Sequence, residues 1–201
     1  MFFEPASLIS SLAIFPLKSR KPSRKRKVSS AEKELAGIQK IAGCTLLNWT
    51  EPEYQQWLLQ IYNPPVLLYV RGDPQVLNLP SLSIVGTRRP TLYGTQMAQR
   101  LGRELAARRL VIVSGMARGM DAIGHQGAMD ANGRAIGVLG TGIDVCYPKE
   151  NKKLYEKVLE RGAIISEFPL RTHAPPENFS RAQPHRCRYA ARRGSGGRRA
   201  V

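Results

Sequence analysis

Apolar runs of four to six residues alternate with amphipathic segments between residues 82 and 166. Four such runs, rich in Val, Ile and Leu, predict strands at 82–85, 110–114, 134–139 and 163–166. The segments between them predict helices at 93–109, 121–132 and 150–161, because apolar or small residues recur at helical spacing. We therefore expect an α/β fold, with a parallel sheet that carries helices on both faces.

Three of the predicted strands lead directly into glycine-bearing turns that precede a helix. The turns are GTRRP at 86–90, SGMARGMD at 114–121 and GTGID at 140–144. In an open parallel sheet such turns lie along one edge, outside the carboxyl ends of the strands. Free N–H groups and the helix macrodipole favour anions at helix starts. The pattern therefore predicts a phosphate-binding rim along this edge.

The first turn combines chain flexibility with a cation. Gly86 permits a tight turn, Thr87 offers a hydroxyl, and the guanidinium of Arg88 presents two donors that match a phosphate. The alternative is that Arg88 and Arg89 are only exposed loop charges.

The second turn allows close approach of a ligand to the backbone. Ser114, Gly115 and Gly119 are small, and Arg118 adds a positive charge. Asp121 is better suited to cap the following helix, because a carboxylate would repel a phosphate.

The third turn offers Gly140, Thr141 and Gly142 to a ligand, and Asp144 is expected to organise the loop that follows. Beyond it, Tyr147 could stack on a base and Lys149 could contact a phosphate, a pairing suited to single-stranded nucleic acid. The alternative is equally open: Tyr147 packs over the strand ends and Lys149 starts a helix.

Catalytic and metal chemistry find little support in the sequence. There is no GxGxxG or GxxxxGK[ST] motif, and no nucleophile, base and orienting group stand together, so we expect no enzyme and no cofactor. Cys44, Cys146 and Cys187 lack the spacing of a zinc site or a disulfide framework, which favours a reducing, cytoplasmic setting without a bound metal. His125 follows Asp121 by one helical turn, and we expect it to be structural. The apolar stretch at 8–15 is too short to span a membrane.

The net charge of +16 is concentrated at the two ends of the chain. Residues 31–180 carry 17 basic and 14 acidic side chains, whereas residues 1–30 and 181–201 carry seven basic side chains each. We expect a disordered basic lead-in (1–30), an extension leading into the sheet (31–80), the α/β domain (81–180) and a disordered Arg/Gly-rich tail (181–201). The basic ends either bind nucleic acid through charge alone or only solubilise the chain.

Five ordered segments resemble the DNA-processing protein A family (DprA, also called Smf). They are PPVLLYVRGD (64–73), SLSIVGTRRPTLYG (81–94), LVIVSGMARGMDAIGHQGAM (110–129), AIGVLGTGIDVCYPKEN (135–151) and ISEFPLRTHAPPENF (165–179). The resemblance implies a Rossmann-like domain that binds single-stranded DNA, protects incoming DNA, assists loading of RecA recombinase during natural transformation, and forms homodimers.

With this resemblance, the DNA-facing or phosphate-binding residues are expected at the three turns and just beyond them. The candidates are Gly86, Thr87, Arg88, Ser114, Gly115, Ala117, Arg118, Gly119, Gly140, Thr141, Gly142, Tyr147 and Lys149. The resemblance implies no catalysis.

The sequence departs from the family pattern at both ends. After Phe179 the arginine- and asparagine-containing turn of the family is replaced by an Arg-, Gly- and Ala-rich stretch, so we expect a Rossmann-like sheet that is incomplete on its C-terminal side. A frameshift is one hypothesis for this change. The resemblance implies that the missing part contributes to the family's dimer contact and to much of its DNA-binding surface, so we expect weak binding of DNA. Two alternatives stay open: a phosphoribohydrolase-type enzyme, whose PGGxGTxxE segment is missing here, and a non-functional fragment.

Overall fold

Six strands form one mixed sheet in the part of the chain that the structure describes. The structure is a computed structural model, and it describes residues 24–173 apart from residue 57, with side chains from residue 30 onward. The strand order is β1-β2-β6-β5-β4-β3. The strands are β1 (Cys44–Asn48), β2 (Leu67–Gly72), β3 (Ser81–Ser83), β4 (Val111–Ser114), β5 (Ala135–Leu139) and β6 (Ala163–Ser166). The predicted tail, and the predicted lead-in up to residue 23, lie outside the described residues.

The helices confirm the predicted α/β class. They are α2 (Arg24–Gln39), α3 (Leu92–Ala107), α4 (Met120–Asp130) and α5 (Lys152–Arg161), with 3-10 turns η1 (Leu58–Gln60), η2 (Pro74–Asn78) and η3 (Lys149–Asn151). The strands and helices predicted between residues 82 and 166 are all present, with ends that differ by at most two residues. Helix α2 begins at Arg24, inside the range predicted as a disordered lead-in. In the described range none of the helices has both the length and the apolar character needed to cross a bilayer.

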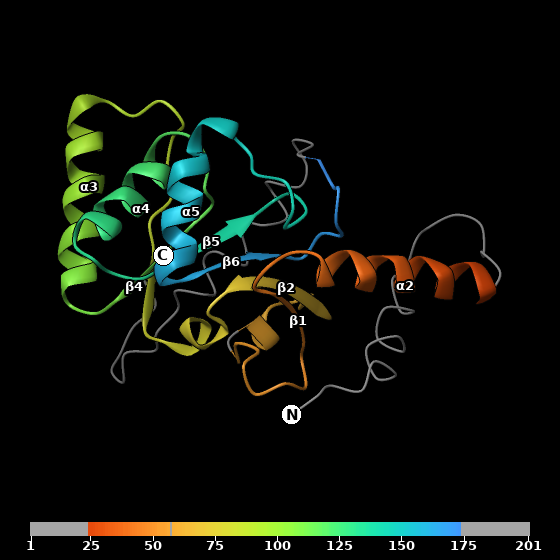
Figure 1. Ribbon diagram of the computed structural model, residues 1–201. Helices are drawn as coiled ribbons and strands as arrows, with labels where there is room; N and C mark the ends of the chain where they lie inside the picture. Colours follow the sequence, from red (N-terminus) through yellow and green to blue (C-terminus); the bar gives the residue numbers. More distant parts are fainter. Residues whose placement is uncertain (1–23, 57, 174–201) are drawn as a thin grey trace.

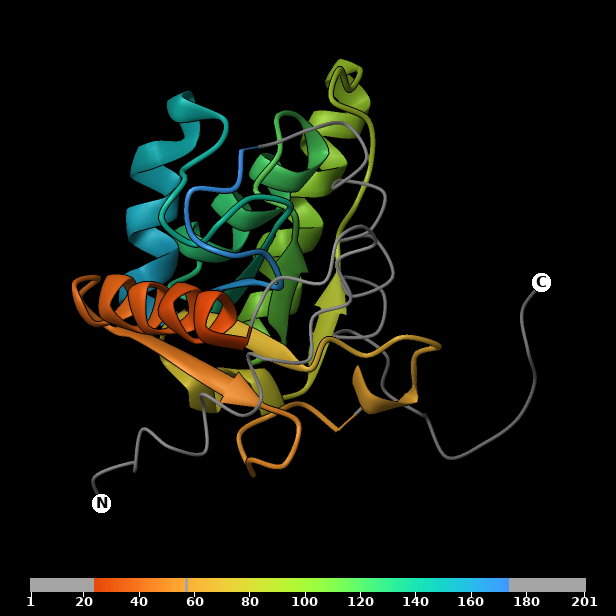
Figure 2. The ribbon, with the colours of Figure 1, turned by 90° about the vertical axis from the view of Figure 1, so that its right-hand side faces the viewer.

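The predicted helices do not divide between the two faces of the sheet. Strands β3, β4, β5 and β6 are parallel and lie side by side in chain order. Each right-handed crossover therefore steps in the same direction and places its helix on the same face. Figures 1 and 2 show α3, α4 and α5 standing together on this face. One apolar core forms here, between the sheet and residues such as Ile38 of α2, Ala106 of α3, Ala128 of α4 and Val158 of α5.

The opposite face is covered by the chain that leads from β1 to β3. Tyr54, Leu58, Val76 and Leu77, from the segment that contains η1 and η2, are fully buried against this face. The strands supply alternate residues to the two cores: in β4, Ile112 belongs to the helix side, whereas Val111 and Val113 belong to the other side. Within the described residues, α-helices cover one face and 3-10 turns the other.

The sheet is mixed because two N-terminal strands join it antiparallel. Strand β2 pairs with β6, and β1 pairs with β2, both in antiparallel register. The extension predicted for residues 31–80 thus contributes strands to the sheet. Helix α2 lies beside β1 and β2 at this end of the molecule (Figure 2).

Candidate functional site

The three glycine-bearing turns lie next to one another at the carboxyl edge of the parallel strands. We call them turn 1 (residues 84–91), turn 2 (115–119) and turn 3 (140–148). Buried small residues of α3, namely Ala98, Gly102 and Ala106, lie on one side of the helix, and α3 makes its most extensive packing with α4. Because α3 follows turn 1 and α4 follows turn 2, this close packing brings the two turns together.

Turn 1 and turn 2 are joined through their backbones. The N–H of Met120 donates to the carbonyl of Thr87 at 3.1 Å. Gly119 has a φ of +78°, and a Cβ at this position would lie 2.4 Å from the carbonyl oxygen of Thr87 and 2.7 Å from the carbonyl carbon of Arg88. Only glycine combines this backbone conformation with so close an approach. Gly119 therefore acts by joining the two turns.

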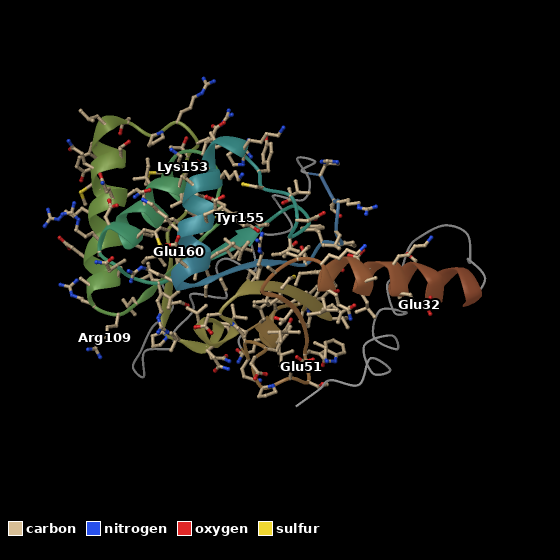
Figure 3. All side chains as sticks on the ribbon, in the orientation of Figure 1. Glu32, Glu51, Arg109, Lys153, Tyr155 and Glu160 are labelled. Atoms are coloured by element: carbon tan, nitrogen blue, oxygen red, sulfur yellow. The ribbon has the colours of Figure 1, made fainter. Side chains whose placement is uncertain are left out.

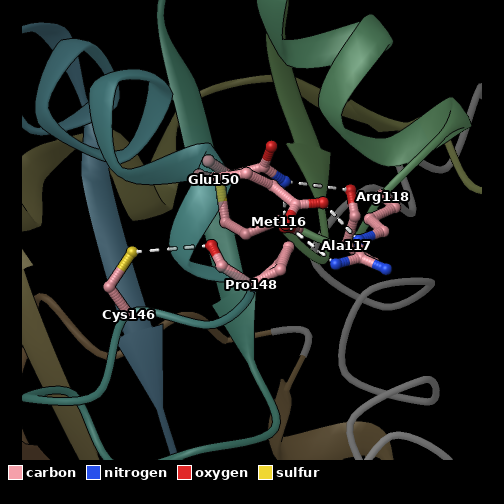
Figure 4. A network of polar contacts seen from close by, with 7 residues as sticks. Met116, Ala117, Arg118, Cys146, Pro148 and Glu150 are labelled. Carbon is pink, nitrogen blue, oxygen red and sulfur yellow. Dashed lines mark hydrogen bonds and ion pairs between the residues drawn. The ribbon is translucent and has the colours of Figure 1, made fainter.

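Turn 2 is joined to the chain that leaves turn 3. The side-chain amide of Asn151 donates to the carbonyl of Met116 at 2.9 Å and to that of Ala117 at 3.4 Å. The guanidinium of Arg118 makes a two-pronged ion pair with Glu150, in which Nη2 and Oε2 are 2.8 Å apart. Figure 4 shows this network, with Arg118 and Glu150 facing each other across it. The three turns thus form one continuous surface.

The end of β4 and the start of turn 2 form hydrogen bonds with neighbouring parts of the protein. The hydroxyl of Ser114, which is fully buried, donates to the carbonyl of Ile84. The N–H of Gly115 donates to Oδ2 of Asp121 at 3.1 Å. Direct contact of Ser114 and Gly115 with a ligand is therefore not supported, because both are buried and these donors are used. Asp121 is structural, as expected, but it stabilises turn 2, while Gly119 holds the N-cap position.

The first residues of turn 3 are buried, which the sequence pattern did not indicate. Gly140, Thr141 and Gly142 are all buried, and Thr141 is only 2% exposed. The hydroxyl of Thr141 donates to the carbonyl of Val145 at 3.0 Å, and the N–H of Gly142 donates to the carbonyl of Thr172 at 2.9 Å. These three residues are thus buried and engaged in internal hydrogen bonds, and their predicted contact with a ligand stays a prediction.

A short piece of chain after β6 covers turn 3. We call residues 169–172 the covering segment. The N–H of Arg171 donates to both carboxylate oxygens of Asp144, at 2.9 and 3.0 Å, so Asp144 organises this region as expected but does so by holding the covering segment. The N–H of Leu170 donates to Oε1 of Glu34 in α2 at 2.7 Å, and Glu34 also accepts from the hydroxyl of Tyr69. The turn patterns carried no signal for this cover.

The remaining candidates are exposed and lie on the joined surface. We call them the exposed rim; its members are Gly86, Thr87, Arg88, Arg118, Tyr147 and Lys149. Tyr147 is 48% exposed, so its ring does not pack fully over the strand ends. Lys149 is exposed and begins η3, in agreement with the alternative that it starts a helical turn. Ala117 is half-buried between these residues. The exposed rim combines three cations with one aromatic ring.

Sequence reasoning missed two features of this surface. Tyr93, in the first turn of α3 just beyond turn 1, is 71% exposed, and its position after GTRRP was the available signal. Glu150 brings a carboxylate onto the rim; its hydrogen bond with Arg118 lowers the pKa of Glu150 from the ordinary range.

His125 is fully buried in α4. Among residues 24–173 no cluster of three or more His, Cys, Asp or Glu side chains could hold a metal ion.

Comparisons with known proteins find relatives of this chain. The family model of DNA recombination-mediator protein A matches residues 45–190. Protein Smf of Synechocystis sp. is 38% identical over 133 residues, which cover 64% of this chain and 33% of that protein. DNA processing protein DprA of Bacillus subtilis is 37% identical over 138 residues, which cover 68% of this chain and 46% of that protein. The chain thus spans less than half the length of these two relatives.

Two solved structures share the fold. The X-ray structure of DNA processing protein A from Streptococcus pneumoniae has a TM-score of 0.70 at 29% identity, covering 86% of this chain and 59% of that one. A structure of DNA processing protein A from Helicobacter pylori, described for its unique single-stranded DNA binding mode, has a TM-score of 0.64 at 30% identity, covering 73% of this chain and 65% of that one.

Proposed function

The chain belongs to the DNA recombination-mediator protein A family, and we propose that it binds single-stranded DNA through the exposed rim. The observation that carries this proposal is that Arg88 of turn 1, Arg118 of turn 2 and Lys149, just after turn 3, are exposed on the joined surface, beside the half-exposed ring of Tyr147. Cations that follow a phosphate backbone, together with rings on which bases stack, are what proteins use to bind single strands without choosing a sequence.

The three turns have different parts in this proposal. Gly86, Thr87 and Arg88 form the open end, where a phosphate meets a guanidinium and exposed backbone. Arg118 and Lys149 extend the charge along the rim, and Tyr147 offers a base its ring. Gly140, Thr141 and Gly142 support the surface from below, because they are buried beneath the covering segment.

We also propose the family's wider role for this chain. Binding of single strands would protect incoming DNA and assist loading of RecA recombinase in natural transformation, in the cytoplasm. The Helicobacter pylori relative, described as binding single-stranded DNA, supports the choice of ligand. Family membership alone supports RecA as a partner and a homodimer as the assembly.

Binding of a fluorescent oligo-dT, followed by anisotropy at several salt concentrations, tests the proposed interface. We expect Arg88→Ala to weaken binding roughly tenfold and to reduce the salt dependence by about one released counterion, because one phosphate contact is lost. The matched control is Arg109→Ala, which removes the same charge at the far end of α3, away from the rim (Figure 3).

Two results would contradict the proposed interface. One is binding that does not respond to salt, because phosphate contacts require a response. The other is an equal loss of affinity in Arg88→Ala and Arg109→Ala, which would indicate attraction by net charge without a located site.

No observation favours the phosphoribohydrolase alternative. Its only resemblance lay in Gly140, Thr141 and Gly142, and the structure buries these residues and occupies the N–H of Gly142. Release of free base from a nucleoside monophosphate would be the result that revives it.

A further inference from the structure

One cation of the exposed rim already has an anionic partner within the protein. The Nε and Nη2 atoms of Arg118 face the two carboxylate oxygens of Glu150 in a side-by-side arrangement. A phosphate presents its oxygens to a guanidinium in the same paired way. A nucleic acid that reaches Arg118 through this edge of the guanidinium therefore has to displace the Glu150 carboxylate.

The pair is accessible to such an exchange. The side chain of Arg118 is 63% exposed and that of Glu150 is 53% exposed, so solvent reaches both groups. Exposed ion pairs contribute little to stability, because water screens them and two long side chains must be held in place. A phosphate with the same geometry can therefore compete with the carboxylate.

Turn 2 does not depend on the ion pair to keep its shape. Asn151 holds the carbonyls of Met116 and Ala117, and Asp121 holds the N–H of Gly115. Gly119 packs against the backbone of turn 1. These contacts stay in place when Arg118 turns away from Glu150, so the pair can open without unfolding the loop.

We propose that Glu150 is an internal competitor that occupies the phosphate position on Arg118 and thereby limits the affinity of the rim for single-stranded DNA. This inference rests on the proposed function and adds an affinity-determining residue to it. The carboxylate leaves Arg118 when a phosphate arrives, and it then stands beside the bound backbone as a repelling charge. Binding at this point is an exchange of one anion for another.

A double-mutant cycle with oligo-dT separates this exchange from simple charge repulsion. We expect Glu150→Gln to tighten binding about fivefold when Arg118 is present, because the amide keeps the size of the side chain and loses its charge. In the Arg118→Ala background, the same change should tighten binding only about twofold, through reduced repulsion alone. Glu160→Gln, at the far end of α5, removes an equal charge away from the rim and should change affinity less than about 1.5-fold.

Each outcome of the cycle decides between alternatives. An equal effect of Glu150→Gln with and without Arg118 would overturn the exchange and leave only repulsion. Weaker binding in Glu150→Gln, with an unchanged unfolding midpoint in urea, would show that the pair positions turn 2 and would also overturn it. If binding depends on Arg88 but the cycle shows no coupling, only this inference fails; if no variant binds oligo-dT, it fails together with the proposed function.

Discussion

Turn 1 and turn 3 contain the same dipeptide, Gly-Thr, and follow parallel strands of the same sheet, yet the surroundings of the two dipeptides are opposite. Gly86 and Thr87 are exposed, and the Thr87 hydroxyl oxygen accepts the N–H of Arg89 at 3.2 Å. Gly140 and Thr141 are buried, and the Thr141 hydroxyl donates to the carbonyl of Val145. The same local sequence thus forms an open surface in one place and a buried support in the other.

The difference comes from chain that is distant in sequence. Nothing in the described residues covers turn 1 as the covering segment covers turn 3. That segment is held by Asp144 from the turn itself and by Glu34 from α2. A glycine-bearing turn at the carboxyl edge of a sheet is therefore only a potential phosphate site, and its accessibility depends on what packs over it.

The largest effect on stability should come from adding a methyl group to one glycine of each turn, Gly142 in turn 3 or Gly86 in turn 1. A Cβ on Gly142 would lie 2.6 Å from the carbonyl oxygen of Pro169 and 3.0 Å from the nitrogen of Arg171, both backbone atoms, so Gly142→Ala should lower the free energy of unfolding by about 2 kcal/mol. A Cβ on Gly86 would lie 2.7 Å from Cγ and 2.9 Å from Cβ of Met120 but would meet no atom of the main chain, so Gly86→Ala should lower the free energy of unfolding by a smaller amount, about 1 kcal/mol. Urea denaturation measures both.

The same pair of variants tests the assignment of roles. Folded Gly142→Ala should keep its affinity for oligo-dT within about twofold, because this glycine does not reach the ligand. Full stability with lost binding in Gly142→Ala would mean that turn 3 contacts the DNA directly and that the covering segment does not protect it.

A smaller effect is expected from the two threonines. Thr141→Val keeps the shape of the side chain but leaves the carbonyl of Val145 without its donor, which should cost about 1 kcal/mol of stability. Thr87→Val, in the exposed turn, should change stability by less than about 0.5 kcal/mol. Thermal or urea unfolding of the two variants side by side gives the comparison. Equal losses would show that the two turns are less different than their burial indicates.

The smallest effect should appear at the end of the exposed rim. Lys149→Ala removes one flexible cation, so binding of oligo-dT should weaken about threefold, less than for Arg88→Ala, because an ammonium lacks the paired donors of a guanidinium. Anisotropy titration of both variants at one salt concentration measures the ratio. A greater loss for Lys149→Ala than for Arg88→Ala would move the centre of the site from turn 1 toward turn 3.

The parallel half of the fold could be predicted from the sequence, because its signals are local. Apolar runs bounded by glycine turns gave β3 to β6, and helical spacing gave α3 to α5, all close to their observed limits. The antiparallel strands β1 and β2 were not predicted, since β2 is defined by pairing with β6 far along the chain, and β1 by pairing with β2. The helices fall on one face because the strand order contains no reversal between β3 and β6, and periodicity alone does not reveal strand order.

The candidate site, like the fold, could be predicted from the sequence only in part. The sequence located all three turns at one edge, and the structure brings them together through Met120, Asn151 and Arg118. The burial of residues 140–142 was missed because it depends on the covering segment, which lies about 30 residues further along the chain. That segment is held by hydrogen bonds to turn 3 and to the carboxylate of Glu34 in α2. The pairing of Arg118 with Glu150 was missed for the same reason, as the two residues are 32 positions apart.

The contact between Glu34 and Leu170 spans 136 residues of sequence. We expect contacts of such separation to form late in folding, because closing a long loop costs conformational entropy. During synthesis, residue 170 emerges long after α2, so the third turn stays uncovered while the strands before it assemble. Completion of the edge that we propose to face DNA is thus tied to the docking of the first described helix, and a change that loosens α2 should also loosen the covering segment, far along the chain.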